Sequence, residues 1–433
     1  MNLLKTSNII AALCFVCVTS FAQQFWLQQP CPTTKYLTKI VFADTLYGWA
    51  SGDSGAVIHT TDGGQNWAVQ QSGTIATVED IFFLNRQLGW LISNDFGLNG
   101  TYFFKTTNGG NNWIPSANPD TTTYFFTIYY QNSLTGFAGG LGGAIYKTTN
   151  TGSNWTKCSV DSSFYIYFPV RKIKFYDDMI GYGCGGQFDF AGVAWVTTNG
   201  GLNWSASGIA PEPDFDIKIF SPDKVIFAGG DLEYGTAIVT STDQGMHWRY
   251  DTTSCYGVAR AIAYRTPAEV WVPLSFSQRW AVNLDSGNAN NWFCLPAPDT
   301  TSVYDAVFAS PTVGWAVGCV GYICTGTLLK YNTSVIGLSE QHNNVPGRFV
   351  LYQNYPNPFN PTTSIKYYLP SSSDVEITFF DALGREIRRL HENNLQAGFH
   401  LAVFNGTDLA SGVYFYRVRA GDFIDFKKMV LIK

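Results

Sequence analysis

Hydrophobic and polar residues alternate in short runs along almost the whole chain, and each run stops at glycine, asparagine, aspartate or proline. Ile40-Val41-Phe42, followed after a turn by Gly48-Trp49-Ala50, is typical of these runs. Alternation with a period of two predicts half-buried β strands, and the closely spaced turn residues predict tight connections between them. No stretch has the period of an amphipathic helix. The pattern therefore predicts an all-β protein.

One turn repeats along the first three quarters of the chain. The sequence Thr60-Thr61-Asp62-Gly63-Gly64-Gln65-Asn66-Trp67 recurs at residues 106–113, 148–155 and 197–204, and more loosely at 241–248. Tryptophans stand at positions 26, 67, 113, 155, 204, 248 and 292, in steps of 41 to 49 residues. Steps of that size match one four-stranded blade of a β-propeller. We expect a seven-bladed propeller over residues 23–332, with six or eight blades as the alternatives.

The last unit, residues 303–331, lacks the terminal tryptophan that ends the others. Phe25-Trp26-Leu27, near the start of the chain, supplies it. We therefore expect the first strand of the chain to complete the last blade, which closes the ring and leaves no open sheet edge.

The repeated turn has a structural reading and a cation-binding reading. Its acidic position is Asp62 or Asp243 in two copies but asparagine in three, so the position does not require charge. Either side chain can accept backbone N–H bonds in a tight turn while the following glycine takes a positive φ, and the tryptophan covers the hairpin. We assign a structural role to these residues: Asp62, Trp67, Asn108, Trp113, Asn150, Trp155, Asn199, Trp204, Asp243 and Trp248.

These turns resemble the Asp-box repeats of sialidases and of photosystem II assembly-factor propellers, over roughly residues 25 to 331. The resemblance implies that the turns lie on the blade margin, away from a ligand face. Sialidase chemistry would need an arginine cluster, a Tyr–Glu pair and an aspartic acid. The arginines of this region are Arg86, Arg171, Arg249, Arg260, Arg265 and Arg279, and none stands in the Arg-Ile-Pro context found before the first sialidase blade. Sialidase activity is therefore not expected.

After a polar linker at 333–349 the composition changes, and residues 350–433 predict a second domain. Three closely spaced prolines open it, and six alternating strands read as a compact Ig-like β-sandwich. The predicted strands are Ser364–Leu369, Val375–Phe380, Arg385–Leu390, Phe399–Phe404, Gly412–Arg419 and Phe423–Ile432.

This domain resembles the type A C-terminal sorting domain of type IX (Por) secretion. The matching landmarks are Asn354–Pro361, Asp381–Glu386, Leu409–Tyr414 and the closing Lys427–Lys433. The resemblance implies that the type IX machinery is a partner of residues 350–433 and that the protein is secreted across the outer membrane, then released or attached to the cell surface. An adhesive Ig-like module is the alternative. We disfavour it because the basic and apolar tail has no evident packing role.

The N-terminus and the charge balance narrow the class further. Lys5, the apolar run Ile9–Val18 and the small residues Ser20 and Ala22 predict a signal peptide over 1–22. No later segment reaches the ~20 apolar residues of a transmembrane helix. Residues 23–349 contain 17 basic and 24 acidic residues, which argues against nucleic acid as a partner.

The cysteines and histidines indicate no cofactor. Seven cysteines follow the signal peptide, an odd number with irregular spacing, so neither a disulfide framework nor a metal site is predicted. Cys319 and Cys324 are the best local pair. The histidines lack metal-ligand spacing, and no Gly-x-Ser-x-Gly nucleophile elbow occurs.

Candidate ligand residues lie in loops that lead from each tryptophan to the next blade. A sequence motif that begins with aspartate and ends with tyrosine occurs four times. It predicts either a polar, aromatic rim that binds a sugar or a protein, or a recurrent turn, and we favour the turn. Phe96, Phe188, Phe190 and Tyr234 add aromatic residues to such a face. The candidate residues are Asp120, Tyr124, Asp161, Tyr165, Asp251, Tyr256, Asp299 and Tyr304.

No catalytic residue is assigned. Asp95, Glu212, Asp214, Asp231 and Glu233 are loop acids from which a glycosidase pair, separated by about 5 to 9 Å, could be drawn. The sequence gives no such distance. Two hypotheses remain: a secreted binding, adhesion or scaffold propeller for glycan or protein, and a secreted glycoside hydrolase acting on polysaccharide.

Overall fold

The computed structural model describes residues 25–433 except 96–99, 162–163, 254, 288–291, 299–300, 321–324, 334–348, 355–356 and 396–397. The predicted signal peptide lies outside the described residues. The chain forms two compact units, residues 1–339 and 340–433. Across the described residues, no helix has both the length and the apolar character needed to cross a membrane.

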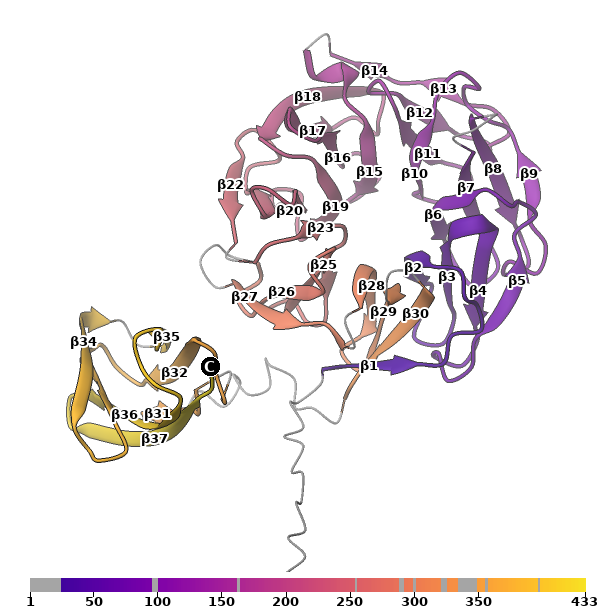
Figure 1. Ribbon diagram of the computed structural model, residues 1–433. Helices are drawn as coiled ribbons and strands as arrows, with labels where there is room; N and C mark the ends of the chain where they lie inside the picture. Colours follow the sequence, from indigo (N-terminus) through magenta and orange to yellow (C-terminus); the bar gives the residue numbers. More distant parts are fainter. Residues whose placement is uncertain are drawn as a thin grey trace, which may run out of the picture. The chain divides into compact units, whose positions relative to one another are not determined.

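The first unit is a ring of seven antiparallel sheets (Figure 1). Each sheet begins with an inner strand, and the inner strands of neighbouring blades contact one another around the axis of the ring. Blades 1 to 4 contain β2 (Leu37–Phe42), β3 (Gly48–Gly52), β4 (Ala56–Thr60) and β5 (Ala68–Gln71); β6 (Thr77–Phe83), β7 (Gly89–Asp95), β8 (Gly100–Thr106) and β9 (Ile114–Ser116); β10 (Phe125–Tyr130), β11 (Gly136–Gly140), β12 (Ile145–Thr148) and β13 (Thr156–Lys157); and β15 (Val170–Phe175), β16 (Gly181–Gln187), β17 (Ala191–Thr197) and β18 (Asn203–Ala210).

Blades 5 to 7 follow the same order with two departures. Blade 6 has a divided inner strand, and blade 7 takes its outer strand from the start of the chain. These blades contain β19 (Asp214–Ile219), β20 (Val225–Gly230), β21 (Thr236–Ser241) and β22 (Arg249–Thr252); β23 (Val258–Ala259), β24 (Ala263–Tyr264), β25 (Val270–Ser275), β26 (Arg279–Asn283) and β27 (Trp292–Pro296); and β28 (Ser302–Ser310), β29 (Val313–Val320), β30 (Thr325–Tyr331) and β1 (Trp26–Gln29). The short β14 (Ser159–Val160) adds a parallel strand to blade 4.

The predicted closure of the ring is confirmed. Strand β1 pairs antiparallel with β30, from Trp26 opposite Tyr331 to Gln29 opposite Leu328. The Trp26 ring also stacks on Trp280 of blade 6, with ring centroids 4.7 Å apart. The seven-bladed count and the all-β class are therefore correct.

The Asp-box turns hold the hairpins at one end of the blades. In the first turn, one oxygen of Asp62 accepts the Thr60 hydroxyl at 2.8 Å and the Asn66 backbone N–H at 3.0 Å. Equivalent bonds reach the residue four positions on from Asn108, Asn150, Asn199 and Asp243, at 2.9 to 3.0 Å. These are the bonds that the structural reading of the turn requires, and asparagine makes them as well as aspartate.

The paired glycines of this turn let neighbouring blades approach closely. Gly64 has a φ of 84°, and a Cβ added there would lie 2.1 Å from the Trp315 ring of blade 7. The indole N–H of Trp315 donates to the Gly63 carbonyl at 3.1 Å, and Trp49 donates to the Gly109 carbonyl of blade 2 at 3.0 Å. The repeated Gly-Gly sequence therefore serves the contact between blades as well as the turn itself.

The inner strands carry a β-bulge at the same place in six of the seven blades. The residue after the bulge is often charged, and in three blades it is an aspartate that accepts a backbone N–H from another blade. The pairs are Asp80 with Ile128, Asp216 with Ile262, and Asp305 with Ile40. Lys172 of blade 4 forms an ion pair with Asp80 of blade 2 at 3.0 Å. Burial lowers the pKa of Lys172, but the Asp80 and Asp216 carboxylates outweigh it and raise the pKa above its usual value.

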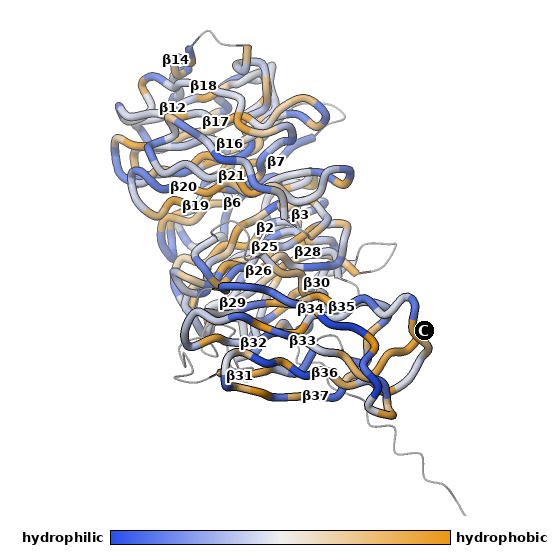
Figure 2. The backbone as a smooth tube through the Cα atoms, turned by 90° about the vertical axis from the view of Figure 1, so that its left-hand side faces the viewer, coloured by the Kyte–Doolittle hydropathy of each residue, from blue (hydrophilic) through white to orange (hydrophobic). Residues whose placement is uncertain are grey.

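The second unit consists of two sheets around one core. One sheet has the order β31 (Val350–Leu351), β32 (Thr362–Leu369) and β35 (Gly398–Asn405), and the other has β34 (Glu386–Leu395), β33 (Ser373–Phe380), β36 (Gly412–Ala420) and β37 (Phe423–Leu431). Hydrophobic and hydrophilic residues alternate along these strands (Figure 2), and the hydrophobic ones, such as Phe379 and Tyr416, form the core. The six predicted strands are present. Strand β31 was not predicted.

The closing tail has a packing role, contrary to the sequence interpretation. It forms β37, which pairs with β36, and Met429 and Leu431 are buried. The proline-rich entry holds the same strand, because Phe359 donates its N–H to the Val430 carbonyl at 2.8 Å and the Asn357 side chain accepts the Val430 N–H at 2.8 Å. The two sequence motifs at the ends of this domain, Asn354–Pro361 and Lys427–Lys433, are thus hydrogen-bonded to each other.

A disulfide that the sequence did not indicate joins Cys255 to Cys294, 39 residues apart. It ties the loop before β23 to the outer strand β27 of the same blade. Cys319 is also disulfide-bonded, but Cys324, the partner that the sequence favours, lies outside the described residues. The pairing of Cys319 with Cys324 stays a prediction.

Candidate functional site

The two ends of the propeller are built from different loops. The Asp-box turns lie between the third and fourth strands, at the same end as the turns between the first and second strands. The opposite end, which we call the loop face, carries the connections between blades and the turns between the second and third strands. The candidate rim residues of the sequence belong mostly to the loop face.

Two arginines lie among aromatic rings at the ends of the inner strands that face the loop face. Arg171 occupies the bulge of β15, and Arg260 follows β23 in blade 6. The Arg171 guanidinium lies 5.5 Å from the Phe126 ring and 5.1 Å from the Phe215 ring, and that of Arg260 lies 4.9 Å from Phe215. Because these residues come from four consecutive inner strands, they form a continuous arc, which we call the arginine mouth.

The positive charge of the arginine mouth is only partly balanced. In the described part of the chain, neither guanidinium has a carboxylate within ion-pair distance. The buried Nε of Arg260 has no hydrogen-bond partner there. Burial lowers the pKa of both arginines, and the Arg260 charge further lowers that of Arg171. Glu79 faces both from a greater distance, and burial raises its own pKa. An anionic group placed here would gain two charge-assisted donors.

Three carboxylates converge farther out on the loop face. Oxygen atoms of Asp189, Glu212 and Asp231 all lie within 4.8 Å of one another. Glu212 is 2 % exposed and Asp231 is 7 % exposed, whereas Asp189 is exposed. Glu212 accepts the Asp189 backbone N–H at 3.2 Å, and Asp231 accepts the Tyr234 N–H at 2.6 Å. Burial, followed by the Asp231, Asp189 and Glu233 charges, raises the pKa of Glu212. We call these three acids, together with Glu233, the acidic group.

The sequence named three members of the acidic group but missed Asp189. That residue adopts a φ of 62°, and this backbone turn brings its side chain to Glu212. Asp214, another acid considered from the sequence, is fully buried apart from the group, and neither of its carboxylate oxygens has a hydrogen-bond partner in the described part of the chain. Burial raises its pKa well above the usual value. Asp95, the last of the loop acids, ends β7 in blade 2.

Exposed aromatic side chains surround the acidic group. Phe190 and Tyr234 lie in the turns that carry Asp189 and Asp231, and Tyr256 follows in the next connection between blades. All three are more than half exposed. Phe188 packs against Phe215 with ring centroids 5.8 Å apart, and thus joins the arginine mouth to the acidic group. Phe96, the remaining predicted aromatic residue, lies outside the described residues.

The predicted rim aspartates make local bonds. Asp120 accepts the Thr122 hydroxyl and backbone N–H and the Tyr146 hydroxyl. Asp161 accepts the Ser205 hydroxyl at 2.9 Å and the Ala206 N–H at 3.1 Å. Asp251 lies within β22 and pairs with Arg249 at 2.7 Å. Asp299 lies outside the described residues. Asp120 makes the turn of the favoured reading, whereas Asp161 and Asp251 bond to strand residues, so the interpretation of the four motifs as one recurrent turn stays a prediction.

The predicted rim tyrosines are distributed unevenly. Tyr124 is half-buried before β10, and Tyr165 lies in the short 3-10 helix η2 (Phe164–Tyr167). Tyr256 lies beside the acidic group, where its ring is 3.2 Å from the position of a Cβ added to Gly235. Tyr304 occupies the β28 bulge, and its ring lies 6.4 Å from that of Phe276, near the arginine mouth. A ligand-binding role for these residues stays a prediction.

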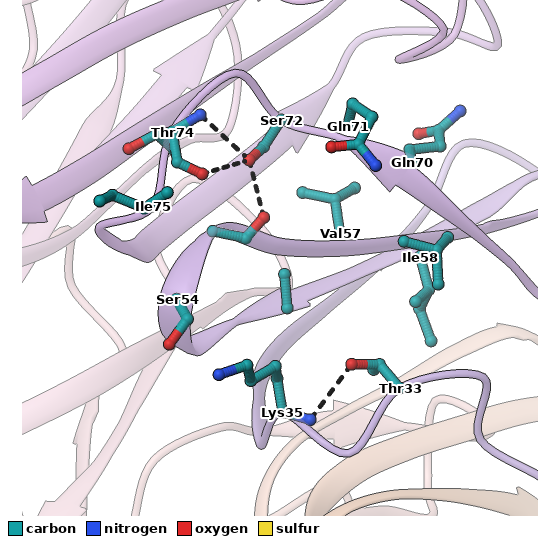
Figure 3. A pocket seen from close by; sticks show the side chains of 13 residues that line it. Thr33, Lys35, Ser54, Val57, Ile58, Gln70, Gln71, Ser72, Thr74 and Ile75 are labelled. Atoms are coloured by element: carbon teal, nitrogen blue, oxygen red, sulfur yellow. Dashed lines mark hydrogen bonds between the residues drawn. The ribbon is translucent and has the colours of Figure 1, made fainter.

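A separate polar pocket lies in blade 1, beside the connection from β1 to β2 (Figure 3). Its hydroxyl groups are engaged in local bonds: Ser72 donates to the Gly55 carbonyl at 2.7 Å and accepts the Thr74 N–H. Lys35 is its one ionisable lining residue. The pocket therefore offers no pair of acids for hydrolysis.

Together, these features define a seven-bladed Asp-box-type propeller with a secretion domain at its C-terminus. Residues 353–433 match the family model described as the secretion system C-terminal sorting domain. The protein therefore carries a type IX sorting domain and is secreted across the outer membrane to the cell surface or the extracellular space. No curated protein matches the sequence.

Solved structures share the propeller fold. One is described as YCF48 bound to D1 peptide, with a TM-score of 0.56, 20 % identity, and coverage of 71 % of this chain and 97 % of that one. YCF48 from Cyanidioschyzon merolae has a TM-score of 0.55, 18 % identity, and coverage of 72 % and 99 %. The GH74 xyloglucanase from Xanthomonas campestris has a TM-score of 0.54 and 11 % identity, and it matches 79 % of this chain but 59 % of its own. At these identities the likeness shows the fold alone.

Proposed function

We propose that the propeller is an extracellular binding module that holds a segment of a partner protein by an anionic group at the arginine mouth. The observation that carries this proposal is the pair Arg171 and Arg260 on either side of Phe215, without ion-pair partners among the described residues. A carboxylate, such as the C-terminus of a peptide, matches two guanidinium groups in charge and in geometry.

The surroundings of the two arginines suit a peptide. Phe126, Phe215 and Phe276 offer ring faces beside the charges, and Tyr304 adds a hydroxyl group. Aromatic side chains in such a setting bury the apolar part of a ligand while the charges fix its orientation. The solved YCF48 structure, which shares the fold, is described as bound to a peptide.

The hydrolase alternative rests on the convergence of Glu212 with Asp231 and Asp189. Carboxyl groups of a retaining glycosidase stand about 5 Å apart, and a raised pKa on Glu212 would suit a general acid. However, Glu212 and Asp231 are 2 % and 7 % exposed, so little of either carboxylate is open to a glycosidic oxygen. We therefore favour binding over hydrolysis.

A direct test compares peptides that differ only at their C-terminus. Short peptides with a free terminal carboxylate should bind the full secreted chain at least ~10-fold more tightly than their amides, the effect of one charge-assisted pair. Arg171→Gln and Arg260→Gln should each remove this preference. Arg279→Gln, which changes an exposed arginine on β26, is the matched control.

A glycan array on the same protein, followed by a product assay on any glycan that binds, tests the alternative. Glycan binding that survives both arginine substitutions would contradict the proposal. Release of reducing sugar that Glu212→Gln abolishes would establish the hydrolase instead.

A further inference from the structure

The arginine mouth and the acidic group lie next to each other on the loop face. Arg171 and Arg260 lie over Phe215, Phe215 packs against Phe188, and Phe188 precedes Asp189 in the chain. The Arg171 Nε also donates to the Gly186 carbonyl, at 3.4 Å, in the strand that leads into this turn. A ligand anchored at the mouth therefore reaches the acidic group across two aromatic rings.

The acidic group has no cationic partner within the described ranges of the chain. None of the described lysines or arginines forms an ion pair with Asp189, Glu212, Asp231 or Glu233. The other acids of the group, after burial, raise the pKa of Glu212, so the group as a whole is crowded with negative charge. Asp189 and Glu233 are exposed to solvent, and an incoming cation can therefore reach the group from the loop face.

The aromatic residues around the group indicate which cation fits. Phe190, Tyr234 and Tyr256 expose their rings beside the carboxylates, and Leu232 adds an exposed apolar side chain. Ammonium and guanidinium groups bind to carboxylates and to ring faces at the same time, while their methylene chains cover apolar surface. A site built for Ca²⁺ needs six to eight oxygen ligands rather than a ring of exposed aromatics.

We infer that the acidic group selects partner segments that carry a lysine or arginine side chain close to the anionic group held at the arginine mouth. This inference rests on the proposed function and names the chemistry of its ligand. The Arg260 guanidinium lies 4.9 Å from the Phe215 ring, and that ring lies 5.8 Å from the Phe188 ring. About three residues of extended peptide, at ~3.3 Å per residue, cover these two contacts. The favoured ligand is thus a segment with opposite charges about three residues apart.

Charge complementarity favours such a peptide over other ligands. A neutral polysaccharide gains nothing from two groups of opposite charge at a fixed separation. A polysaccharide of uronic acids suits the arginines, but the acidic carboxylates repel it. A zwitterionic peptide satisfies both groups at once.

The test uses the full secreted chain and four hexapeptides of one design. The first is Ala-Phe-Lys-Ala-Ala-Leu with a free C-terminus, and the others replace Lys by norleucine, replace Lys by Glu, or amidate the C-terminus. Isothermal titration gives the affinities. The Lys peptide should bind about 10-fold more tightly than the norleucine peptide, and the Glu peptide should bind more weakly still.

Two exposed members of the group supply the protein variants. Asp189→Asn keeps a side chain that tolerates the positive φ of this position, and Glu233→Gln keeps the size of the residue. The double variant should reduce the preference for Lys over norleucine to about 1, with the affinity for the norleucine peptide unchanged. Asp178→Asn, an exposed acid in the turn between β15 and β16 at the opposite end, should leave the preference intact.

The outcomes separate this inference from the proposed function. If amidation and Arg171→Gln leave every affinity unchanged, the proposed function is wrong. If amidation and Arg171→Gln both weaken binding while the Lys and norleucine peptides bind equally, the proposed function of the arginine mouth is supported and the inference about the acidic group is wrong. If the Asp189→Asn effect appears only in the presence of added Ca²⁺ and EDTA removes it, the acidic group is a cation site and the inference is also overturned.

Discussion

At the Asp-box end of the propeller the Asp62 carboxylate accepts the Thr60 hydroxyl and both N–H groups of Asn66, and these bonds lower its pKa to about 2. At the loop face, burial and neighbouring acids raise the pKa of Glu212, and Arg260 keeps a buried Nε without a partner among the described residues. Asp62 is thus satisfied within its own turn, whereas Glu212 is surrounded by other acids and the Arg260 Nε has no hydrogen-bond partner in the described residues.

This difference separates residues that hold the fold from residues that are open to a ligand. A polar group whose bonds are made within its own turn contributes to stability and has little to offer another molecule. A charge without an opposite charge nearby lowers the stability of the free protein. Binding of a complementary group then stabilises the protein. Substitutions should therefore lower stability at the Asp-box end and along the ring, and lower binding at the loop face.

The largest effect on stability is expected where the ring closes. Trp26 is 2 % exposed and stacks on Trp280, so Trp26→Ala should lower the free energy of unfolding by about 3 to 5 kcal/mol. Thermal or urea unfolding measures this value. Leu27→Ala in the same strand, at a residue that is 37 % exposed, should cost less than about 1 kcal/mol. Equal losses at the two positions would mean that the strand does not close the ring through Trp26.

Asp305, on the inner strand β28, gives a test by pH. Burial raises the pKa of Asp305 to about 6 from an ordinary value of 3.8. Because the folded-state pKa is the higher one, ionisation of Asp305 costs stability as the pH rises from about 4 to about 6, and the cost stays complete above that range. Asp305→Asn removes this cost and can still accept the Ile40 N–H.

The free energy of unfolding of the Asp305→Asn variant, relative to that of the unmodified protein, should therefore rise by about 2 to 3 kcal/mol as the pH increases from 4 to 7. Unfolding in urea at both pH values measures the change. Asp62→Asn is a matched control, because it alters an aspartate whose pKa is lowered rather than raised. A gain at pH 4 that equals the gain at pH 7 would contradict the raised pKa.

A smaller effect is expected at the Asp-box turn itself. Asp62→Ala removes an acceptor for three donors and should cost about 1 to 2 kcal/mol in urea unfolding. Asp62→Asn keeps an acceptor, as Asn108 does in the next blade, and should cost less than about 0.5 kcal/mol. If asparagine were as costly as alanine, the charge would matter and the structural reading of the turn would be wrong.

The sequence predicted the propeller because each blade repeats the same turn. The tryptophan spacing set the blade count, and the absence of a final tryptophan after residue 303 pointed to Trp26. Strands β14 and β31 were missed because two residues are too few for an alternating pattern. The disulfide was missed because Cys255 and Cys294 are brought together by the pairing of strands within blade 6, which no local spacing records.

The candidate site was harder to predict than the fold. Arg171 and Phe215 lie in bulges, where one additional residue interrupts the alternation of the inner strand. A signal was present: Glu79-Asp80-Ile81, Arg171-Lys172-Ile173 and Phe215-Asp216-Ile217 align at the same place in three blades. Asp189 depends on a positive φ in a turn, and the sequence does not fix that conformation.

The smallest change in stability is expected at the loop face, where it distinguishes the two ends most clearly. Arg171→Gln removes a cation whose pKa is lowered by burial and by the Arg260 charge, and the guanidinium has no ion pair to lose among the described residues. The free energy of unfolding should therefore change by less than about 0.5 kcal/mol, while the affinity for peptides with a free C-terminus falls at least ~10-fold. Parallel unfolding and titration experiments measure both quantities. A loss of more than about 2 kcal/mol in stability would place Arg171 among the residues that hold the ring, and its proposed part in binding would then need to be abandoned.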